Sequence, residues 1–361
     1  MGKLDKDRHQ KELAIRYCLA VGLIPFVEVL VHNTADLTET TEVLTDIDAL
    51  GIGVSGDGAL HRTAFDCKTT NKMSAINRAL WARGLCDYLH MDSAFVILKR
   101  TASRNHRLSA LTLQIDLHDE DSFIDLSKTY DPLFPSVTHY QSEIENWDRA
   151  EAAYRKWLWS GPLYHLNHAV VPTAQRPASV FRKIVAELRS IKGNFDPEKG
   201  EHLSILFDTM SSCFLMWSVM ARDIRRFYDP SMDKSEFEQT LRFYMWDGRE
   251  AYHIRQRLAE RGAREPAGHA VDLPSWNSLV QMAGLIIGSP QSVFECASIC
   301  KELSMRSVAD RSETLEAALK KRISSNNRVR QFTGSLAKYL VDASGMPTDM
   351  LKSVSAAISL V

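Results

Sequence analysis

Thr45-Asp46-Ile47-Asp48-Ala49-Leu50-Gly51-Ile52 is followed by Gly56-Asp57-Gly58 and then by Phe65-Asp66-Cys67-Lys68. The outer segments alternate and are rich in β-branched or aromatic residues, so the glycine turn between them predicts a β-hairpin. If the loop has three residues with Gly58 in the left-handed conformation, Ser55 pairs with Ala59 and Asp48 lies opposite Asp66. A loop of two or four residues would instead place the two acids on opposite faces.

The facing acids suggest a chemistry. Two opposed carboxylates are destabilising unless one is protonated or a cation lies between them. Asp48 and Asp66 can hold a divalent ion through hard oxygen ligands, and Lys68 lies two residues beyond Asp66 on the same face. An ammonium group there can orient or help to deprotonate a water, or stabilise negative charge on a phosphate. This combination suits the hydrolysis of phosphodiesters.

At these residues the chain resembles the PD-(D/E)XK, or restriction-endonuclease-like, nuclease superfamily. Asp48 matches the first metal-binding acid of that family, Asp66 the second acid, and Lys68 the lysine, while Ile47 replaces the nominal proline. The resemblance implies that Asp48, Asp66 and Lys68 are catalytic, and that the two acids and the carbonyl of Cys67 bind Mg²⁺, for which Mn²⁺ can substitute. The implied fold is α/β, with a mixed central sheet flanked by helices.

The order of predicted elements agrees with that core. We expect a helix from about Asp5 to Val21, a strand at Phe26–Val31, the hairpin, a helix over Ser74–Leu89, a strand at Ala94–Leu98, a short helix over Asn105–Leu113, a strand at Gln114–Leu117 and a helix near Asp119–Tyr130. The nuclease-like domain is therefore assigned to residues 1–135, near Pro132 and Pro135.

Residues 136–361 have a different pattern, because strand signals nearly vanish and long amphipathic helices take over. The expected helices are Glu143–Trp159, Ala178–Ile191, Glu201–Tyr228, Lys234–Arg261, Trp276–Ile287, Ser292–Met305, Ser312–Val341 and Thr348–Leu360. Glycines and prolines punctuate their ends. This pattern predicts an all-helical second domain that serves substrate grip, sensing or oligomerisation.

Four further residues are candidates for the site. Glu12 on the first helix and Asp46 on the hairpin could be additional acids, and Arg78 and Arg83 could contact the phosphates of a nucleic acid. The competing interpretation of Glu12, Arg78 and Arg83 is a charge on a solvated helix face, and Asp46 is favoured as a flank of the site.

Composition limits the other possibilities. The chain has 361 residues and a net charge of −1, so nucleic-acid binding must depend on local patches. The six cysteines show no paired spacing and are expected to be reduced thiols of a cytoplasmic protein. No signal peptide, membrane-spanning run, nucleotide-binding Walker motif or dinucleotide fingerprint is expected.

Several motifs outside the hairpin have both a functional and a structural interpretation. His165 and His168 have helical metal-ligand spacing without an accompanying acid, and Cys296 and Cys300 are best explained as buried apolar side chains. Arginine clusters near residues 222–226, 255–264 and 320–330 could follow a phosphate backbone, although charged helix faces usually remain solvated.

The preferred hypothesis is a Mg²⁺-dependent nuclease that cuts DNA, with RNA left open as a substrate, in a bacterial restriction or anti-phage system. The alternatives are a non-catalytic interaction subunit built on a nuclease-like scaffold and a nuclease that a partner protein activates. In either case a protein partner or a second copy would bind through the helical domain.

Overall fold

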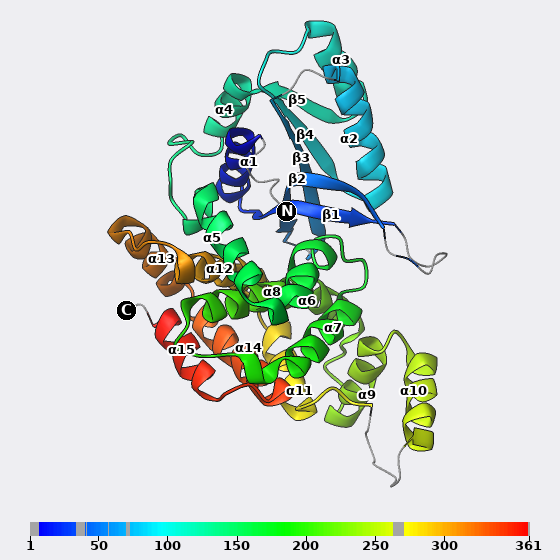
Figure 1. The fold of residues 1–361 in the computed structure, drawn as a ribbon. Coiled ribbons are helices and arrows are strands. Elements are labelled where there is room, and N and C mark those ends of the chain that lie inside the picture. Colours follow the sequence, from blue (N-terminus) through cyan, green and yellow to red (C-terminus); the bar gives the residue numbers. More distant parts are fainter. Residues whose placement is uncertain are drawn as a thin grey trace.

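The computed structural model describes residues 7–33, 40, 42–56, 58–69, 73–262 and 271–359. Asp57, at the centre of the predicted turn, lies outside these ranges. The chain forms a sheet layer followed by a helical layer, which lie one above the other in Figure 1.

A five-stranded mixed sheet forms the first layer. Its strands are β1 (Ile24–His32), β2 (Val43–Val54), β3 (Leu60–Lys68), β4 (Ser93–Leu98) and β5 (Ile115–Asp119), and they lie side by side in sequence order. β2 pairs antiparallel with both β1 and β3, whereas β4 pairs parallel with both β3 and β5. The sheet therefore changes from a meander to crossover connections at β3, which carries Asp66 and Lys68.

The hairpin between β2 and β3 has the register expected from the sequence. Ser55 N–H donates to the Ala59 carbonyl at 2.9 Å, and Gly58 adopts a φ of 83°, the left-handed conformation that glycine allows. The ladder continues to the pair formed by Ala49 and Phe65. Asp48 and Asp66 are the next residues on the two strands and face each other.

Four helices cover the two faces of the sheet. They are α1 (Arg8–Ala20) and α4 (Glu120–Lys128) on one face and α2 (Ala75–Leu89) and α3 (Arg104–Thr112) on the other, as Figure 1 shows. Ser74 accepts a hydrogen bond from Asn77 N–H at the start of α2, as a serine N-cap does. Aromatic side chains from α1, β3, β4 and α4 pack together beneath α1: Tyr17, Phe65, Phe95 and Phe123.

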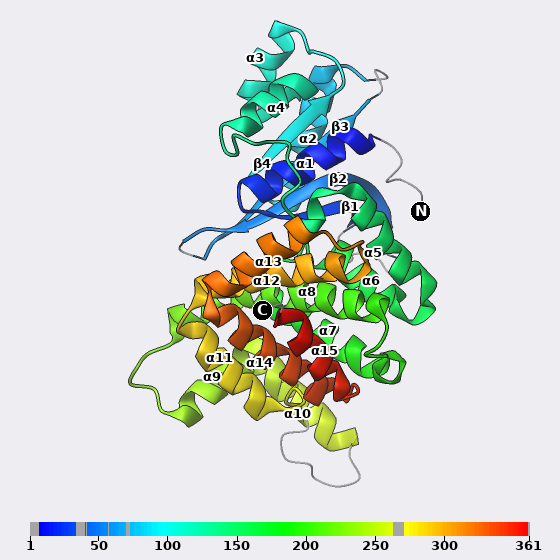
Figure 2. The ribbon, with the colours of Figure 1, turned by 90° about the vertical axis from the view of Figure 1, so that its left-hand side faces the viewer.

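The helical layer contains only helices among the described residues beyond 135. They are η1 (Tyr140–Ser142), α5 (Ile144–Lys156), η2 (Leu158–Ser160), α6 (Gly161–His165), η3 (Leu166–Val170), α7 (Pro177–Ser190), η4 (Lys192–Asn194), α8 (Gly200–Phe227), α9 (Lys234–Met245), α10 (Arg249–Gly262), α11 (Trp276–Ile287), α12 (Pro290–Val308), α13 (Glu313–Ser325), α14 (Asn327–Ser344) and α15 (Asp349–Ile358). α8 packs along α12, and Figure 2 shows both beneath the sheet layer.

Two long predicted helices are each divided in the structure. The segment Lys234–Arg261 breaks between α9 and α10, where Asp247 and Gly248 both have positive φ. The segment Ser312–Val341 breaks at Asn326, whose side chain caps α14 by accepting from Arg328 N–H. In both places a residue suited to a turn overrides a continuous amphipathic pattern.

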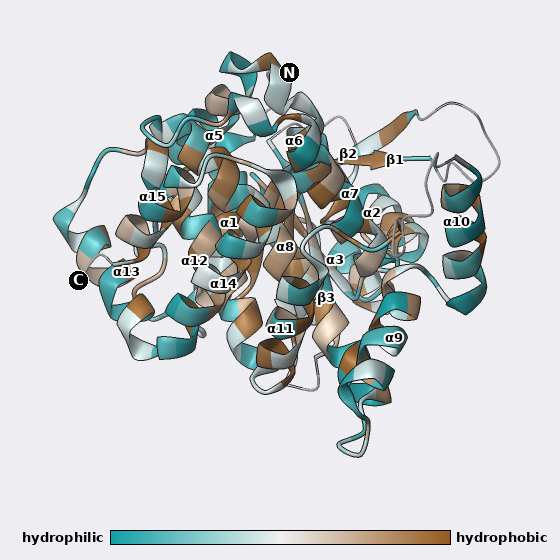
Figure 3. Cartoon of the chain, turned by 90° about the horizontal axis from the view of Figure 1, so that it is seen from below, coloured by the Kyte–Doolittle hydropathy of each residue, from teal (hydrophilic) through white to brown (hydrophobic). Residues whose placement is uncertain are grey.

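α8 corrects the expectation that no segment could span a bilayer. It is the one described helix that is long and apolar enough to do so, but 89% of its most apolar stretch is buried inside the protein. Figure 3 shows its hydrophobic ribbon at the centre of the view and the more hydrophilic α10 at the edge. Such burial is also typical of the central helix of a helical core, so α8 is weak evidence for a membrane.

The coarse fold prediction is confirmed: a mixed sheet flanked by helices precedes a helical region. Buried apolar side chains form one continuous cluster that passes from the sheet layer into the helical layer. The two layers therefore share a core, and a change at their boundary affects both.

Candidate functional site

The pair of acids lies where the β2–β3 ladder stops. Beyond Ala49 and Phe65, the backbone N–H of Cys67 donates to Asp48 Oδ2 at 2.9 Å instead of to a strand carbonyl. Asp48 and Asp66 are buried, with exposed fractions of 6% and 4%. The strand ends thus hold two carboxylates near the surface of the sheet while the main chain of Cys67 borders them.

Lys68 lies between the two acids. Its Nζ is 2.6 Å from Asp48 Oδ2 and 3.6 Å from Asp66 Oδ1, and it lies 3.8 Å from Asp7 Oδ2. Burial alone would lower the pKa of this ammonium group, but the charge and hydrogen bond of Asp48, together with Asp66, raise it above its usual value. Lys68 is therefore a cation and a hydrogen-bond donor at neutral pH.

Arg78 reaches Asp66 from α2, on the opposite side of the acid from the hairpin partner. Its Nη1 donates to Asp66 Oδ2 at 3.0 Å and Oδ1 at 3.1 Å. Burial nevertheless raises the pKa of Asp66, although Arg78 and Lys68 act to lower it. Arg78 is therefore near the site, as expected from the sequence, and it contacts one of the two acids.

Two residues that the sequence analysis missed complete the cluster. Lys11 of α1 is 1% exposed, forms an ion pair with Glu28 of β1 and lies 3.8 Å from Asp48 Oδ1. Glu28 is the lone charge within an otherwise apolar strand, which was the available signal. Lys11 offered none, because lysine on an amphipathic helix usually faces solvent.

Glu28 has an unusual backbone and an unpaired atom. In the register of β1 with β2, Val27 pairs with Ala49 and Val29 with Ile47, so Glu28 lies opposite Asp48. Its φ is 52°, a conformation that non-glycine residues seldom adopt and that is often found at functional sites. Burial raises its pKa although Lys11 lowers it, and its Oε2 is buried without a hydrogen-bond partner among the described residues.

Two of the candidate residues have their partners outside this cluster. Glu12 forms an ion pair with Arg16 and accepts from Ile144 N–H, because its side chain turns towards α5. Arg83 forms an ion pair with Asp87 on the exposed face of α2.

Asp46 is adjacent to the cluster. It pairs in β2 with Leu30 of β1, and its charge contributes to the raised pKa of Glu28. This fits the favoured interpretation of Asp46 as a flank of the site.

The two other candidate ligand pairs have structural contacts. His168 Nε2 lies 2.9 Å from Asp208 Oδ2 inside the helical layer, and the ring of His165 packs edge-on against His32. Cys296 and Cys300 are buried free thiols. These contacts agree with the packing interpretation of all four residues.

The site can be tested for its fit to a divalent ion. As the side chains lie, the described residues contain no group of three or more His, Cys, Asp or Glu arranged around a common metal position. The donor types nevertheless fit Mg²⁺, since Asp48, Asp66 and the unpartnered Oε2 of Glu28 are hard oxygens beside one another. Lys68 and Arg78 occupy oxygens that such an ion would share.

Comparisons of the chain with protein-family models, with curated proteins and with solved structures find no match.

Proposed function

We propose that this protein is a metal-dependent nuclease of the restriction-endonuclease-like type that hydrolyses phosphodiester bonds, DNA being the preferred substrate. The observation that carries the proposal is the convergence of Asp48, Asp66 and Lys68, with Lys68 Nζ within 3.6 Å of an oxygen of each acid. The order of strands and helices around the hairpin supports the proposal, because the family that the chain resembles has the same order.

The acids would hold the metal ion. Asp48 and Asp66 are its proposed ligands with the Cys67 carbonyl, and Glu28 is added to the set by its buried free oxygen. Bound Mg²⁺ would polarise a phosphoryl oxygen and lower the pKa of a bound water. Mn²⁺ has the same oxygen chemistry and can substitute.

Lys68 would act as a donor. Because its pKa is raised by Asp48, it is protonated at neutral pH and is suited to orienting the attacking water or stabilising negative charge on the phosphate.

The remaining two cations would set the geometry. Arg78 holds both oxygens of Asp66, and Lys11 joins Glu28 to Asp48 from α1. Both are positioning residues, because their contacts are with the acids. A role in bacterial restriction or anti-phage defence belongs to this proposal through the resemblance alone, and a cytoplasmic location through the unpaired cysteines.

Cleavage assays with a matched variant test the proposal. Wild-type protein is incubated with plasmid, linear duplex, single-stranded DNA and RNA, each with Mg²⁺, with Mn²⁺ and with a chelator. We expect metal-dependent cleavage that Lys68→Ala lowers by about 100- to 1000-fold, the usual range for loss of one charge-stabilising donor. Lys338→Ala, which changes an exposed lysine of α14 outside the basic clusters, is the control and should cut like wild type.

Undiminished cutting by Lys68→Ala would contradict the assignment. If the wild-type chain binds Mn²⁺ at the acids but cuts no substrate, the partner-activated alternative is favoured. If it neither binds metal nor cuts, the non-catalytic scaffold is favoured instead.

A further inference from the structure

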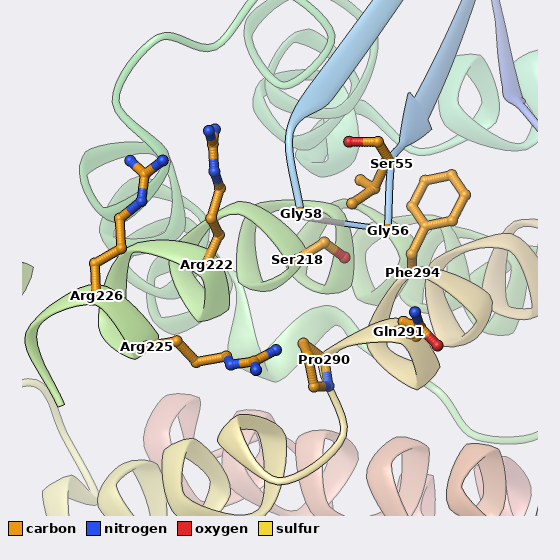
Figure 4. A pocket seen from close by; sticks show the side chains of 11 residues that line it. Ser55, Gly56, Gly58, Ser218, Arg222, Arg225, Arg226, Pro290, Gln291 and Phe294 are labelled. Carbon is orange, nitrogen blue, oxygen red and sulfur yellow. The ribbon is translucent and has the colours of Figure 1, made fainter. Parts of the chain in front are cut away.

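A pocket lies beside the turn of the hairpin, away from the acids. It has a volume of about 510 Å³ and is formed where the β2–β3 turn meets α8 and the start of α12. Figure 4 shows Ser55, Gly56 and Gly58 of the turn above Ser218 and three arginines of α8, with Pro290, Gln291 and Phe294 of α12 beside them. The volume is within the range of pockets that hold small organic ligands.

The arginines of this pocket carry charge that no described acid neutralises. Arg222, Arg225 and Arg226 have no ion pair with any carboxylate in the part of the chain that the structure describes. The acid among them in the sequence, Asp223, is turned away and accepts a hydrogen bond from Tyr244 at 2.8 Å. The described lining of the pocket is thus electropositive.

The side chains approach the pocket from different directions. In Figure 4, Arg225 extends beneath the turn towards Pro290, whereas Arg222 and Arg226 point upwards to the left of Gly58.

The pocket favours phosphate over other anions. Guanidinium groups bind phosphate oxygens through paired N–H donors, and three arginines match a ligand with more than one phosphate. α12 begins at Pro290, so the positive end of its dipole adds to the same field. Phe294 gives an aromatic wall on which a planar ring can stack.

We propose that this pocket binds a small ligand of the nucleotide class, with its phosphates on Arg222, Arg225 and Arg226 and its base against Phe294. The site is separate from the acids and does not depend on the proposed nuclease activity. It lies where β2 ends, about 20 Å from Asp48 in the middle of the strand at the usual rise of a strand. Its wall is the turn of the hairpin whose other end carries Asp48, Asp66 and Lys68.

Binding is measured with a fluorescent ADP analogue in the presence of a chelator, so that phosphate cannot bind through a metal at the acids. Unlabelled ADP, inorganic pyrophosphate, adenosine and a 20-nucleotide DNA strand are the competitors. We expect saturable binding that ADP and pyrophosphate displace and adenosine does not. Raising the salt concentration should weaken it, since the contacts are ionic.

The variants separate the pocket from the rest of the molecule. Arg225 and Arg226 are exposed, so the double variant Arg225→Ala/Arg226→Ala should fold and should raise the Kd at least tenfold. Arg330→Ala and Lys68→Ala should bind like wild type, and thermal unfolding checks that every variant is folded. Phe294→Ala should weaken ADP more than pyrophosphate, because only ADP has a base to stack.

Three results would overturn the proposal. They are the absence of saturable ADP binding below about 1 mM, the weak limit for a specific site; an unchanged Kd in the double arginine variant; and displacement by the DNA strand but not by ADP or pyrophosphate. The last result would assign these arginines to a nucleic-acid strand.

Discussion

Two lysine–aspartate pairs with the same 2.6 Å separation lie in the two layers of this protein. Lys68 contacts Asp48 at the sheet, and Lys301 contacts Asp208 in the helical layer. Their surroundings differ in one respect. In the helical layer several donors surround one carboxylate, whereas the sheet pair lies among further acids, one of which keeps an oxygen without a described partner.

The helical network is closed. Asp208 Oδ1 accepts from Lys301, and Asp208 Oδ2 accepts from Tyr154 OH at 2.7 Å and lies 2.9 Å from His168 Nε2. Burial would raise the pKa of Asp208, but Lys301 and His168 lower it far below its usual value. Lys301 also lies over the ring of Phe26 of β1 at 4.9 Å, so the network ties the helical layer to the sheet.

The sheet cluster is open. Burial raises the pKa of both Asp66 and Glu28 despite their cationic partners, and Glu28 keeps a buried oxygen without a described partner. Its residues are therefore held in a state that another positive charge would improve. The contrast teaches that a buried ion pair alone does not mark a site, so the candidate site is chosen for its unpartnered acid oxygen at a strained strand position.

The largest effect on stability is expected from a substitution of Asp208. Asp208→Ala leaves Lys301, which is 1% exposed, without its carboxylate in the core. We expect the free energy of unfolding to fall by about 3–5 kcal/mol, as measured by urea denaturation. Asp342→Ala, which breaks an exposed pair with Lys338, is the control and should change it by less than about 1 kcal/mol. A loss as small as the control's would mean that the network is not structural.

The same substitution at Asp66 should affect cleavage strongly and stability less. Asp66→Ala removes a proposed metal ligand and should lower Mg²⁺-dependent cleavage by about 100- to 1000-fold. Because it removes an acid opposed to Asp48 but also leaves Arg78 without its carboxylate, the free energy of unfolding should fall by about 1–2 kcal/mol, less than for Asp208→Ala. Cleavage assays and urea denaturation of one preparation measure both. Unfolding of the variant at 25 °C would show that the cluster is mainly structural.

The hairpin could be predicted because its physics is local. A left-handed glycine at Gly58 sets the loop, the loop sets the register, and the register places Asp48 opposite Asp66. Three residues of the candidate site follow from that single turn. The helices were likewise visible from periodicity, except where Gly248 and Asn326 divide them.

The other members of the cluster depend on packing between distant elements. Lys11 meets Glu28 only because α1 crosses the sheet, and Glu28 turns inwards through a backbone distortion that strand propensity does not encode. Glu12, one residue after Lys11, lies towards α5 instead, since adjacent helix positions point about 100° apart. A sequence can therefore identify the helix that reaches a site without identifying the residue.

The dependence of the free energy of unfolding on acidic pH provides a weaker test in the helical layer. Hydrogen bonds from Arg306, reinforced by Tyr140 and Arg311, lower the pKa of Glu316 from 4.5 to about 2. A carboxylate with a lowered pKa stabilises the fold above its unfolded pKa, and this contribution is lost as the pH falls from about 4.5 to about 2. Since its side chain is 28% exposed, solvent screening limits the effect to about 1–2 kcal/mol. Glu316→Gln should flatten this dependence in urea titrations between pH 2 and 6.

Glu28 should behave with the opposite sign. Its pKa is raised, so its ionisation opposes folding, and the contribution of this group is most favourable at low pH and is lost as the pH rises above 4.5. Glu28→Gln should therefore be destabilised relative to wild type most at low pH and least at high pH. Parallel pH dependences for the two glutamine variants would contradict the distinction between closed and open clusters.

The smallest effect is expected within α2, where two arginines test the same distinction. Arg78 is bound to the buried Asp66, and Arg83 to the exposed Asp87. Arg78→Ala should lower the cleavage rate about tenfold because Asp66 loses the group that orients it, as happens with partners of metal ligands. Arg83→Ala should leave the rate within about twofold, since an exposed pair contributes little. Arg78→Lys distinguishes orientation from charge, because lysine keeps the charge but cannot hold both carboxylate oxygens in the fixed geometry of a guanidinium group. Equal rates for the alanine variants at 78 and 83 would mean that Arg78 forms an ordinary surface pair, and the open cluster would then be limited to the hairpin, Glu28 and Lys11.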